Sequence, residues 1–214
     1  MGKYIILLLL TVSVWSNDFD KAVEDYNKGS YIQALNIFYV LAKEGDAEAQ
    51  YNVGMIYANG KGVKVDLSQS LRWYEKAAKQ GNTSAQYNLA KLLYDKDKSD
   101  PHAYVKAKHW YEKAVEGGVK EAYNNLAALY MEGQGVEKDQ KKAFELFKKA
   151  AQMGDSSAQV NVGVIYAWGE GIDHDKMKAY ENFKKALKAG RSEASAHLDK
   201  PVSYTHLRAH ETPE

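Results

Sequence analysis

The strongest constraint on this chain is an internal period of 36 to 37 residues. Five glycines mark it, at separations of 36, 37, 36 and 36 residues: Gly45, Gly81, Gly118, Gly154 and Gly190. Each follows a segment with helical apolar periodicity, where glycine supplies the left-handed backbone that ends a helix. A fixed period of this length predicts a repeat protein, because one helix pair cannot bury its apolar face without stacked neighbours.

Each period contains two helical patterns. The first occupies 47–60, 83–96, 120–133 and 156–169, and its apolar residues are spaced like Ala49, Val53 and Tyr57 on one helix face. The second occupies 70–81, 107–118, 143–154 and 179–190 and sets alanines beside large aromatic residues. Small residues beside large ones allow neighbouring helices to pack closely.

The connections also repeat. A glycine loop joins the two helices in three copies, and an aspartate four residues after its second glycine is suited to cap the next helix: Asp66, Asp139 and Asp175. In the second copy, Asp100 followed by Pro101 predicts the same start. Gly54 and Gly163 fall inside helices, at a cost of about 1 kcal/mol against alanine. We interpret them as sites where a neighbouring helix backbone approaches closely.

The combined pattern AxAQYNxGxxYxxGxGVxxD…WYxKAAxxG resembles the Sel1-like repeat, a relative of the tetratricopeptide repeat. The resemblance covers four copies, 46–81, 82–118, 119–154 and 155–190, after a tetratricopeptide-like capping helix pair at 17–45. Residues 191–200 begin a truncated fifth copy. The resemblance implies an all-α fold, an α/α solenoid (superhelix) that binds other proteins. Known members serve as adaptors in cell-envelope, secretion, flagellar and signalling settings, and in endoplasmic-reticulum quality control.

The two ends are set aside from this fold prediction. Residues 1–16 have a positive start, an apolar run over 4–14 and a small residue, Ser16, at the exit, as a cleaved signal peptide does. The run is shorter than the roughly 20 residues that span a bilayer. We therefore expect a periplasmic or secreted protein with no integral membrane span after cleavage, and a eukaryotic secretory lumen is the alternative. Residues 201–214 lack periodicity, and 202–212 resemble the translation of a sequencing-library adapter.

Composition excludes several kinds of chemistry. The chain has 29 Lys and Arg against 28 Asp and Glu, so no global field attracts nucleic acid. It has no cysteine, which excludes disulfides, cysteine-ligated metals and thiol nucleophiles. His102 and His109 lie seven residues apart and are interpreted as exposed histidines, and the loop at 95–100 lacks the glycine of a calcium-binding loop. We expect no catalytic residue, no metal, no cofactor and no enzymatic activity.

Two alternatives remain open. Some exported, cysteine-rich members of the Sel1-like repeat family carry a β-lactamase or penicillin-binding label. This chain lacks their cysteines and has no serine in the Ser-x-x-Lys arrangement that such chemistry uses. The other alternative is a module that binds peptidoglycan or another glycan through exposed Tyr and Trp side chains.

The candidate binding residues form a ladder at one register of the first helix: Asn52, Asn88, Asn125 and Asn161. In tetratricopeptide relatives such asparagines clamp an extended peptide, because an amide can bond both N–H and C=O of a backbone. The alternative is that each amide bonds backbone groups of the adjacent repeat. Neighbouring positions that differ between copies, including Glu48, Met55 and Lys91, would supply selectivity. Trp168, on a polar loop, is a candidate partner anchor or a side chain packed on the next repeat.

Overall fold

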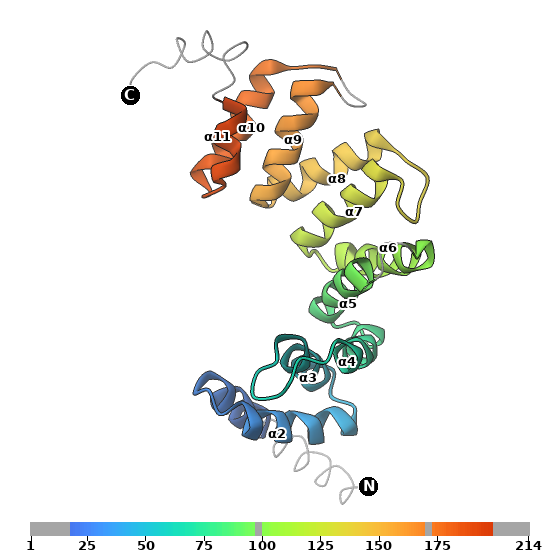
Figure 1. Cartoon of the computed structure of the whole chain (residues 1–214), viewed down its shortest axis with the longest axis vertical. Coiled ribbons are helices and arrows are strands. Elements are labelled where there is room, and N and C mark those ends of the chain that lie inside the picture. Colours follow the sequence, from blue (N-terminus) through green and yellow to red (C-terminus); the bar gives the residue numbers. More distant parts are fainter. Residues whose placement is uncertain (1–17, 97–99, 170–172, 199–214) are drawn as a thin grey trace, which may run out of the picture. The chain divides into compact units, whose positions relative to one another are not determined.

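A computed structural model describes residues 18–96, 100–169 and 173–198, and all regular structure in these ranges is helical (Figure 1). The chain divides into two compact units, Met1–Asp95 and Lys96–Glu214. The proposed signal peptide and the C-terminal tail lie outside the described residues. None of the described helices is long and apolar enough to cross a membrane.

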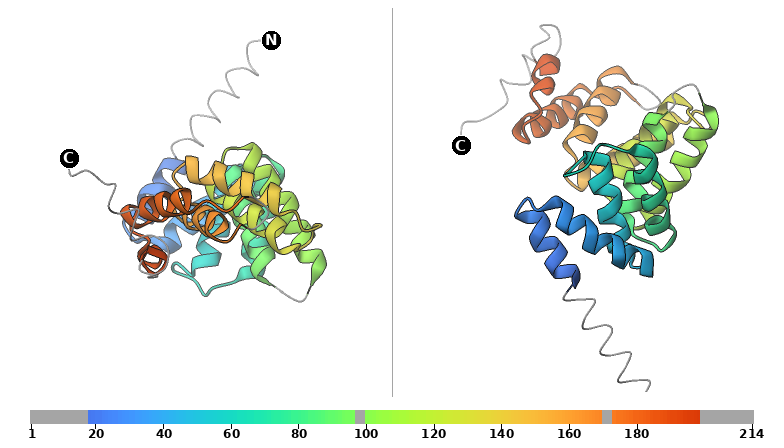
Figure 2. Two further views of the ribbon diagram at one scale, coloured as in Figure 1. Left: turned by 90° about the horizontal axis from the view of Figure 1, so that it is seen from above. Right: turned by 60° about the horizontal axis from the view of Figure 1, so that its bottom comes forward.

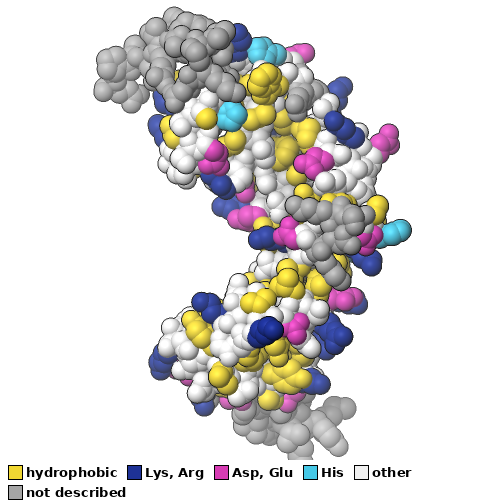
Figure 3. Space-filling model, in the orientation of Figure 1, with side chains coloured by type: hydrophobic (Ala, Val, Ile, Leu, Met, Phe, Trp, Pro, Cys, Tyr) yellow, Lys and Arg dark blue, Asp and Glu magenta, His cyan; other side chains and the backbone are white. Residues whose placement is uncertain are grey.

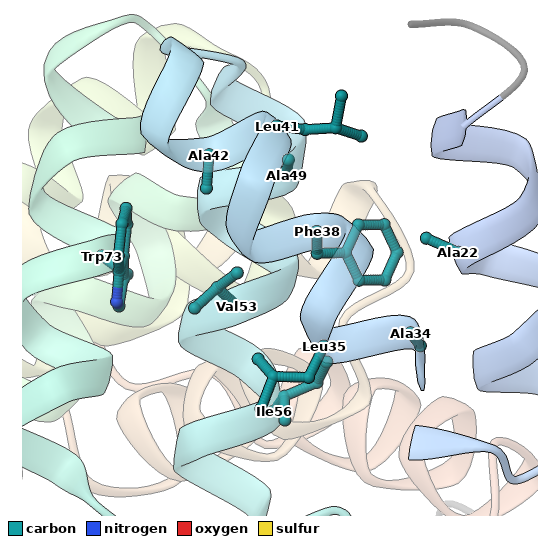
Figure 4. Close-up of a cluster of buried hydrophobic side chains, with 10 residues drawn as sticks. All are labelled: Ala22, Ala34, Leu35, Phe38, Leu41, Ala42, Ala49, Val53, Ile56 and Trp73. Carbon is teal, nitrogen blue, oxygen red and sulfur yellow. The ribbon is translucent and has the colours of Figure 1, made fainter. Parts of the chain in front are cut away.

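The first unit holds a helix over 18–27, α2 (Tyr31–Glu44), α3 (Ala47–Asn59), α4 (Leu67–Lys79) and most of α5 (Thr83–Lys96). Its core lies between helix 18–27, α2, α3 and α4, and Figure 4 shows Phe38, Val53 and Ile56 within it. Trp73 of α4 closes the same cluster. A turn at 28–29 separates helix 18–27 from α2, with Gly29 at φ 82°.

The second unit contains the second helix of the second repeat, the third and fourth repeats and the start of the fifth copy. Its elements are α6 (Pro101–Glu116), α7 (Lys120–Glu132), α8 (Gln140–Gln152), α9 (Ser156–Trp168), α10 (Lys176–Lys188), a 3-10 turn (Ser192–Ala194) and α11 (Ser195–Leu198). Consecutive helices pack side by side from α6 to α10 (Figures 1 and 2). The start of the fifth copy buries Ala194 and Leu198 against α10. Charged side chains lie on the outside of both units (Figure 3).

The predicted helix ends are confirmed. The side chains of Asp66, Asp139 and Asp175 accept hydrogen bonds from backbone N–H groups three residues ahead, at 2.9 to 3.0 Å. Asp100 accepts from the backbone N–H of His102 at 2.9 Å, with proline in the first turn. The five period-marking glycines all have positive φ, between 79° and 107°. Each cap satisfies a backbone group that has no partner within its helix.

The interpretation of the two mid-helix glycines needs a correction. A β-carbon on Gly54 would lie 2.7 Å from the ring of Tyr74, and one on Gly163 would lie 2.7 Å from the ring of Phe183. The close neighbour is therefore an aromatic side chain of the second helix in the same repeat, and not a helix backbone. Because these glycines have no β-carbon, the buried rings pack directly against the helix backbone at these positions.

Candidate functional site

The four ladder asparagines lie at one register of α3, α5, α7 and α9, and each is half-buried. Their hydrogen bonds differ between copies. The differences follow the aromatic residue on the second helix of the preceding repeat, which is Phe38, Tyr74, Tyr111 or Phe147 in turn. All four of these rings are buried.

Where that residue is tyrosine, the next asparagine is bonded to it. The amide of Asn125 donates to the Tyr111 hydroxyl at 3.2 Å. In the first unit, the side chain of Asn88 interacts with the hydroxyls of both Tyr74 and Tyr51 and favours their ionised forms. Burial raises the pKa of Tyr74, and the Asn88 hydrogen bond only partly opposes that shift. Asn88 and Asn125 thus join adjacent repeats.

Where that residue is phenylalanine, no hydroxyl is available. Asn52, which follows Phe38, instead donates to the backbone carbonyl of Glu48 in its own helix at 2.9 Å. Asn161, which follows Phe147, donates to the side-chain oxygen of Asn124 at 3.1 Å. His197 occupies the ladder register of the fifth copy and stacks on the ring of Phe183, with centroids 4.6 Å apart.

The second unit links these groups into a chain of side-chain hydrogen bonds. The Asn161 amide donates to Asn124, Asn124 donates to Asn125 at 3.3 Å, and Asn125 donates to the Tyr111 hydroxyl. The side-chain oxygen of Asn161 accepts no hydrogen bond from the described residues, so it stays open to an external donor.

A pocket of about 190 Å³ opens beside Asn161, between α7 and α9. Its walls are Ala128, Met131, Glu132, Phe147, Asn161, Val164 and Ile165. Phe147 lines this space, and its counterpart in the preceding repeat is Tyr111, whose hydroxyl binds Asn125. An apolar hollow beside an amide suits a partner that inserts one side chain and donates a backbone N–H.

The remaining candidate residues are spread over separate places. Glu48 accepts a hydrogen bond from the Asn82 amide at 2.9 Å, which joins two repeats of the first unit. Met55 is half-buried on α3, and Lys91 is exposed on α5. Trp168 is 65% exposed and is the last residue of α9, so it ends a helix and does not lie within the following loop.

Sequence reasoning missed Asn124 and the pocket walls contributed by Met131, Glu132 and Phe147. The available signal was the change from tyrosine at 74 and 111 to phenylalanine at 147 in an otherwise constant register. Among the described residues, no group of three or more His, Asp or Glu side chains is placed to hold a metal ion.

Comparison with known proteins gives a consistent result. The model of the Sel1 repeat matches residues 47–82, 83–119, 120–155 and 156–190. No curated protein shows a significant match. The crystal structure of a protective antigen of uropathogenic Escherichia coli, which displays an SLR fold, is 29% identical with a TM-score of 0.78. The alignment covers 88% of this chain but only 41% of that one, so this chain spans about two fifths of the antigen's length.

Two further structures support the fold. A Sel1 repeat protein from Oxalobacter formigenes is 29% identical, with a TM-score of 0.73 over 83% of this chain and 73% of the other. An immunity protein from Pseudomonas aeruginosa is 19% identical, with a TM-score of 0.55 over 86% of this chain and 72% of the other. At that identity the last similarity shows the fold alone.

Proposed function

The chain belongs to the Sel1 repeat family, and we propose that it is an exported adaptor that holds an extended segment of a partner protein on the first helices of its repeats. The Sel1 repeat fold is a scaffold for interactions between proteins. The proposal adds the place and the mode of binding. One observation carries it, namely the pocket between α7 and α9 with the open oxygen of Asn161 at its wall.

The ladder divides into two classes under this proposal. Asn88 and Asn125 hold repeats together through tyrosine hydroxyls, so replacing them disturbs the framework. Asn161 has no tyrosine partner and lines an apolar pocket. The ladder therefore combines both interpretations that the sequence leaves open, a structural amide at some positions and a ligand-binding amide at Asn161.

The proposed location is the cell envelope, with a bacterial periplasm preferred. The support is the leader-like sequence at 1–16. Fusing residues 1–20 to a reporter that is active only after export tests this. An active reporter is expected, and an inactive reporter from a fusion protein that the cell demonstrably produces would remove the export proposal.

The proposed adaptor has no enzymatic activity. The support is the lack of cysteine in the chain and of a serine arranged for penicillin chemistry. Purified protein incubated with fluorescent penicillin should remain unlabelled. A covalent adduct on a mapped serine would instead favour the enzymatic alternative.

The adaptor role is tested by site-specific photo-crosslinking. A photoreactive amino acid replaces Glu132, which is exposed at the wall of the pocket. In a second variant the photoreactive amino acid replaces Lys141, an exposed residue at the start of α8 outside the pocket. After irradiation in envelope extract, the captured partner segment is sequenced by mass spectrometry. One dominant segment is expected from position 132 and not from position 141.

The matched variants are Asn161→Ala and Asn182→Ala. Asn182 is a half-buried asparagine of the same unit that bonds its own helix at 2.8 Å and lies outside this pocket. Capture from position 132 should fall at least several-fold with Asn161→Ala and stay unchanged with Asn182→Ala, with the same circular dichroism for both. Equal capture from both variants would show that the pocket is not the binding site.

A further inference from the structure

A second surface, on α8 and α10, holds more positive charge than the corresponding helices of the earlier repeats. Helix α8 contains four lysines and one glutamate, and α10 contains five lysines and one glutamate. Helix α4 has three basic residues against one glutamate, and α6 has three against two. The near-zero net charge of the whole chain conceals this local excess.

The excess arises from a change of sign at one register. Glu75 of α4 pairs with Lys79 at 2.6 Å, and Glu112 of α6 pairs with Lys108 at 2.9 Å. The same register holds Lys148 in α8 and Lys184 in α10. A face that neutralises itself in the first two repeats is therefore basic in the last two.

A groove of about 280 Å³ opens on this surface between α8, α9 and α10. Three lysines from two helices line it, Lys148, Lys178 and Lys185, and its apolar part is formed by Ala151, Val162 and Tyr166. Gln152, Gln159, Glu181 and Asn182 complete the walls. The groove thus offers cations, an apolar floor and amides at one place.

An aromatic pair places two of the lysines. The rings of Phe144 and Tyr166 pack edge to face with centroids 5.3 Å apart. The ammonium of Lys148 lies 5.8 Å from the first centroid, and that of Lys178 lies 5.4 Å from the second. Cation–π contacts of this kind restrict the side chains before a ligand arrives, so binding costs less conformational entropy.

The existing ion pairs leave these lysines available. Lys148 lies 3.6 Å from Glu145 and Lys178 lies 3.0 Å from Asp175, and both lysines are about half exposed. Exposed pairs of this type contribute only about 0 to 1 kcal/mol, so an incoming carboxylate can compete with them. Lys185 has no carboxylate partner among the described residues.

We infer that this groove binds an acidic segment of a partner protein. Carboxylates of the segment meet the three lysines, an apolar side chain contacts Tyr166, and backbone groups meet the amides of Gln152 and Asn182. A uniform polyanion fits less well, because Glu181 in the wall repels it while a peptide N–H can donate to that carboxylate. The groove and the α7–α9 pocket are separate sites, so this inference does not depend on the proposed adaptor pocket.

The test measures binding of the full-length protein to a fluorescent decapeptide of alternating Glu and Leu. The comparison probes are the same peptide with every Glu replaced by Gln, a single-stranded 20-nucleotide DNA, and vesicles containing 30 mol% phosphatidylglycerol. The acidic peptide should bind at low salt and weaken as salt rises, and the Gln peptide should bind at least tenfold more weakly.

The test variant carries both Lys148→Gln and Lys185→Gln. The control variant carries both Lys76→Gln and Lys113→Gln, at the two positions of α4 and α6 that correspond to Lys185. The test variant should weaken binding of the acidic peptide about tenfold, and the control should leave it unchanged. The inference is overturned if both variants have the same effect. It is also overturned if DNA or vesicles bind more tightly than the peptide and lose that binding in the test variant.

Discussion

The glutamine in the motif AxAQ provides the sharpest test of how adjacent repeats are held together. In the first repeat, the Gln80 amide donates to the side-chain oxygen of Gln50 at 2.8 Å and to the carbonyl of Gly45 at 3.0 Å. In the fourth repeat, Gln159 is the counterpart of Gln50 and Ala189 is the counterpart of Gln80. Among the described residues, no group donates a hydrogen bond to the buried side-chain oxygen of Gln159.

The change Ala189→Gln should supply the missing donor. The backbone at Ala189 has φ −83° and ψ 9°, close to the −89° and 3° of Gln80, so a glutamine there leaves the helix in the same direction. A hydrogen bond contributes about 0.5 to 1.5 kcal/mol net, and ordering a glutamine side chain costs up to about 2 kcal/mol. With two bonds possible, we expect a net gain of about 0.5 to 1 kcal/mol.

The converse change, Gln80→Ala, should cost more than that gain. It leaves the oxygen of Gln50, a residue only 5% exposed, without its donor, and an orphaned buried acceptor costs about 1 to 3 kcal/mol. Ala189→Met is the control, because methionine has similar length and no N–H group. Urea unfolding followed by circular dichroism, with hydrogen exchange at α9 and α10, measures all three variants.

The argument fails if Ala189→Gln and Ala189→Met change the unfolding free energy equally. Equal values would mean that contact area, and not the donor, accounts for any gain. For a chain of this size, the expected gain corresponds to a rise in Tm of about 1 to 4 °C.

Three further predictions concern stability. Gly163→Ala should lower the unfolding free energy by about 1 to 2 kcal/mol in urea titration, because the new β-carbon would lie 2.7 Å from the buried ring of Phe183. Adding Phe183→Leu should recover part of the loss, and an unchanged stability of Gly163→Ala would contradict the close packing of glycine and ring. The backbone N–H of Lys178 donates a hydrogen bond to Asp175 and lowers the pKa of that carboxyl in the folded protein. The stability contributed by the ionised carboxyl is therefore present above about pH 4 and is lost as pH falls through the lower folded value. Asp175→Asn should weaken the acid dependence of Tm, and an unchanged dependence would contradict this prediction. Burial raises the pKa of Tyr74 in the folded protein. The stability that this provides is present below about pH 10 and should be lost as pH rises further, and Tyr74→Phe should reduce that alkaline loss in thermal melts. An equal alkaline loss in both proteins would mean that the phenol ionises together with the exposed tyrosines, and would contradict the prediction.

Much of the fold could be predicted from the sequence because its determinants are local and repeated. The glycine at each period end, the capping aspartates and the alanine–aromatic stripe act within one helix or one turn. Trp73, Tyr74 and Ala77, for example, fall on one helix face by spacing alone, and all three are buried. The repetition of each signal confirmed its meaning across four copies.

The candidate site was less predictable, because its chemistry depends on groups that meet across repeats. The ladder register was visible in the sequence, but the partners of Asn125 and Asn161 were not. Tyr111 binds the asparagine fourteen residues further along the chain through its hydroxyl, and Phe147 has no hydroxyl to offer the asparagine at the same separation. Periodicity places both residues on helices, but only the three-dimensional packing brings the ring edge to the amide.

The central claim is that the aromatic residue of one repeat decides whether the next ladder asparagine is structural or open to a partner. Its most direct test is the dissociation constant of the segment captured at position 132, measured for the wild-type protein, Phe147→Tyr and Tyr111→Phe. The account predicts that Phe147→Tyr places a hydroxyl against Asn161, fills the pocket and weakens binding at least tenfold without lowering Tm, while Tyr111→Phe leaves the pocket and the affinity intact. Wild-type affinity in Phe147→Tyr would contradict the claim.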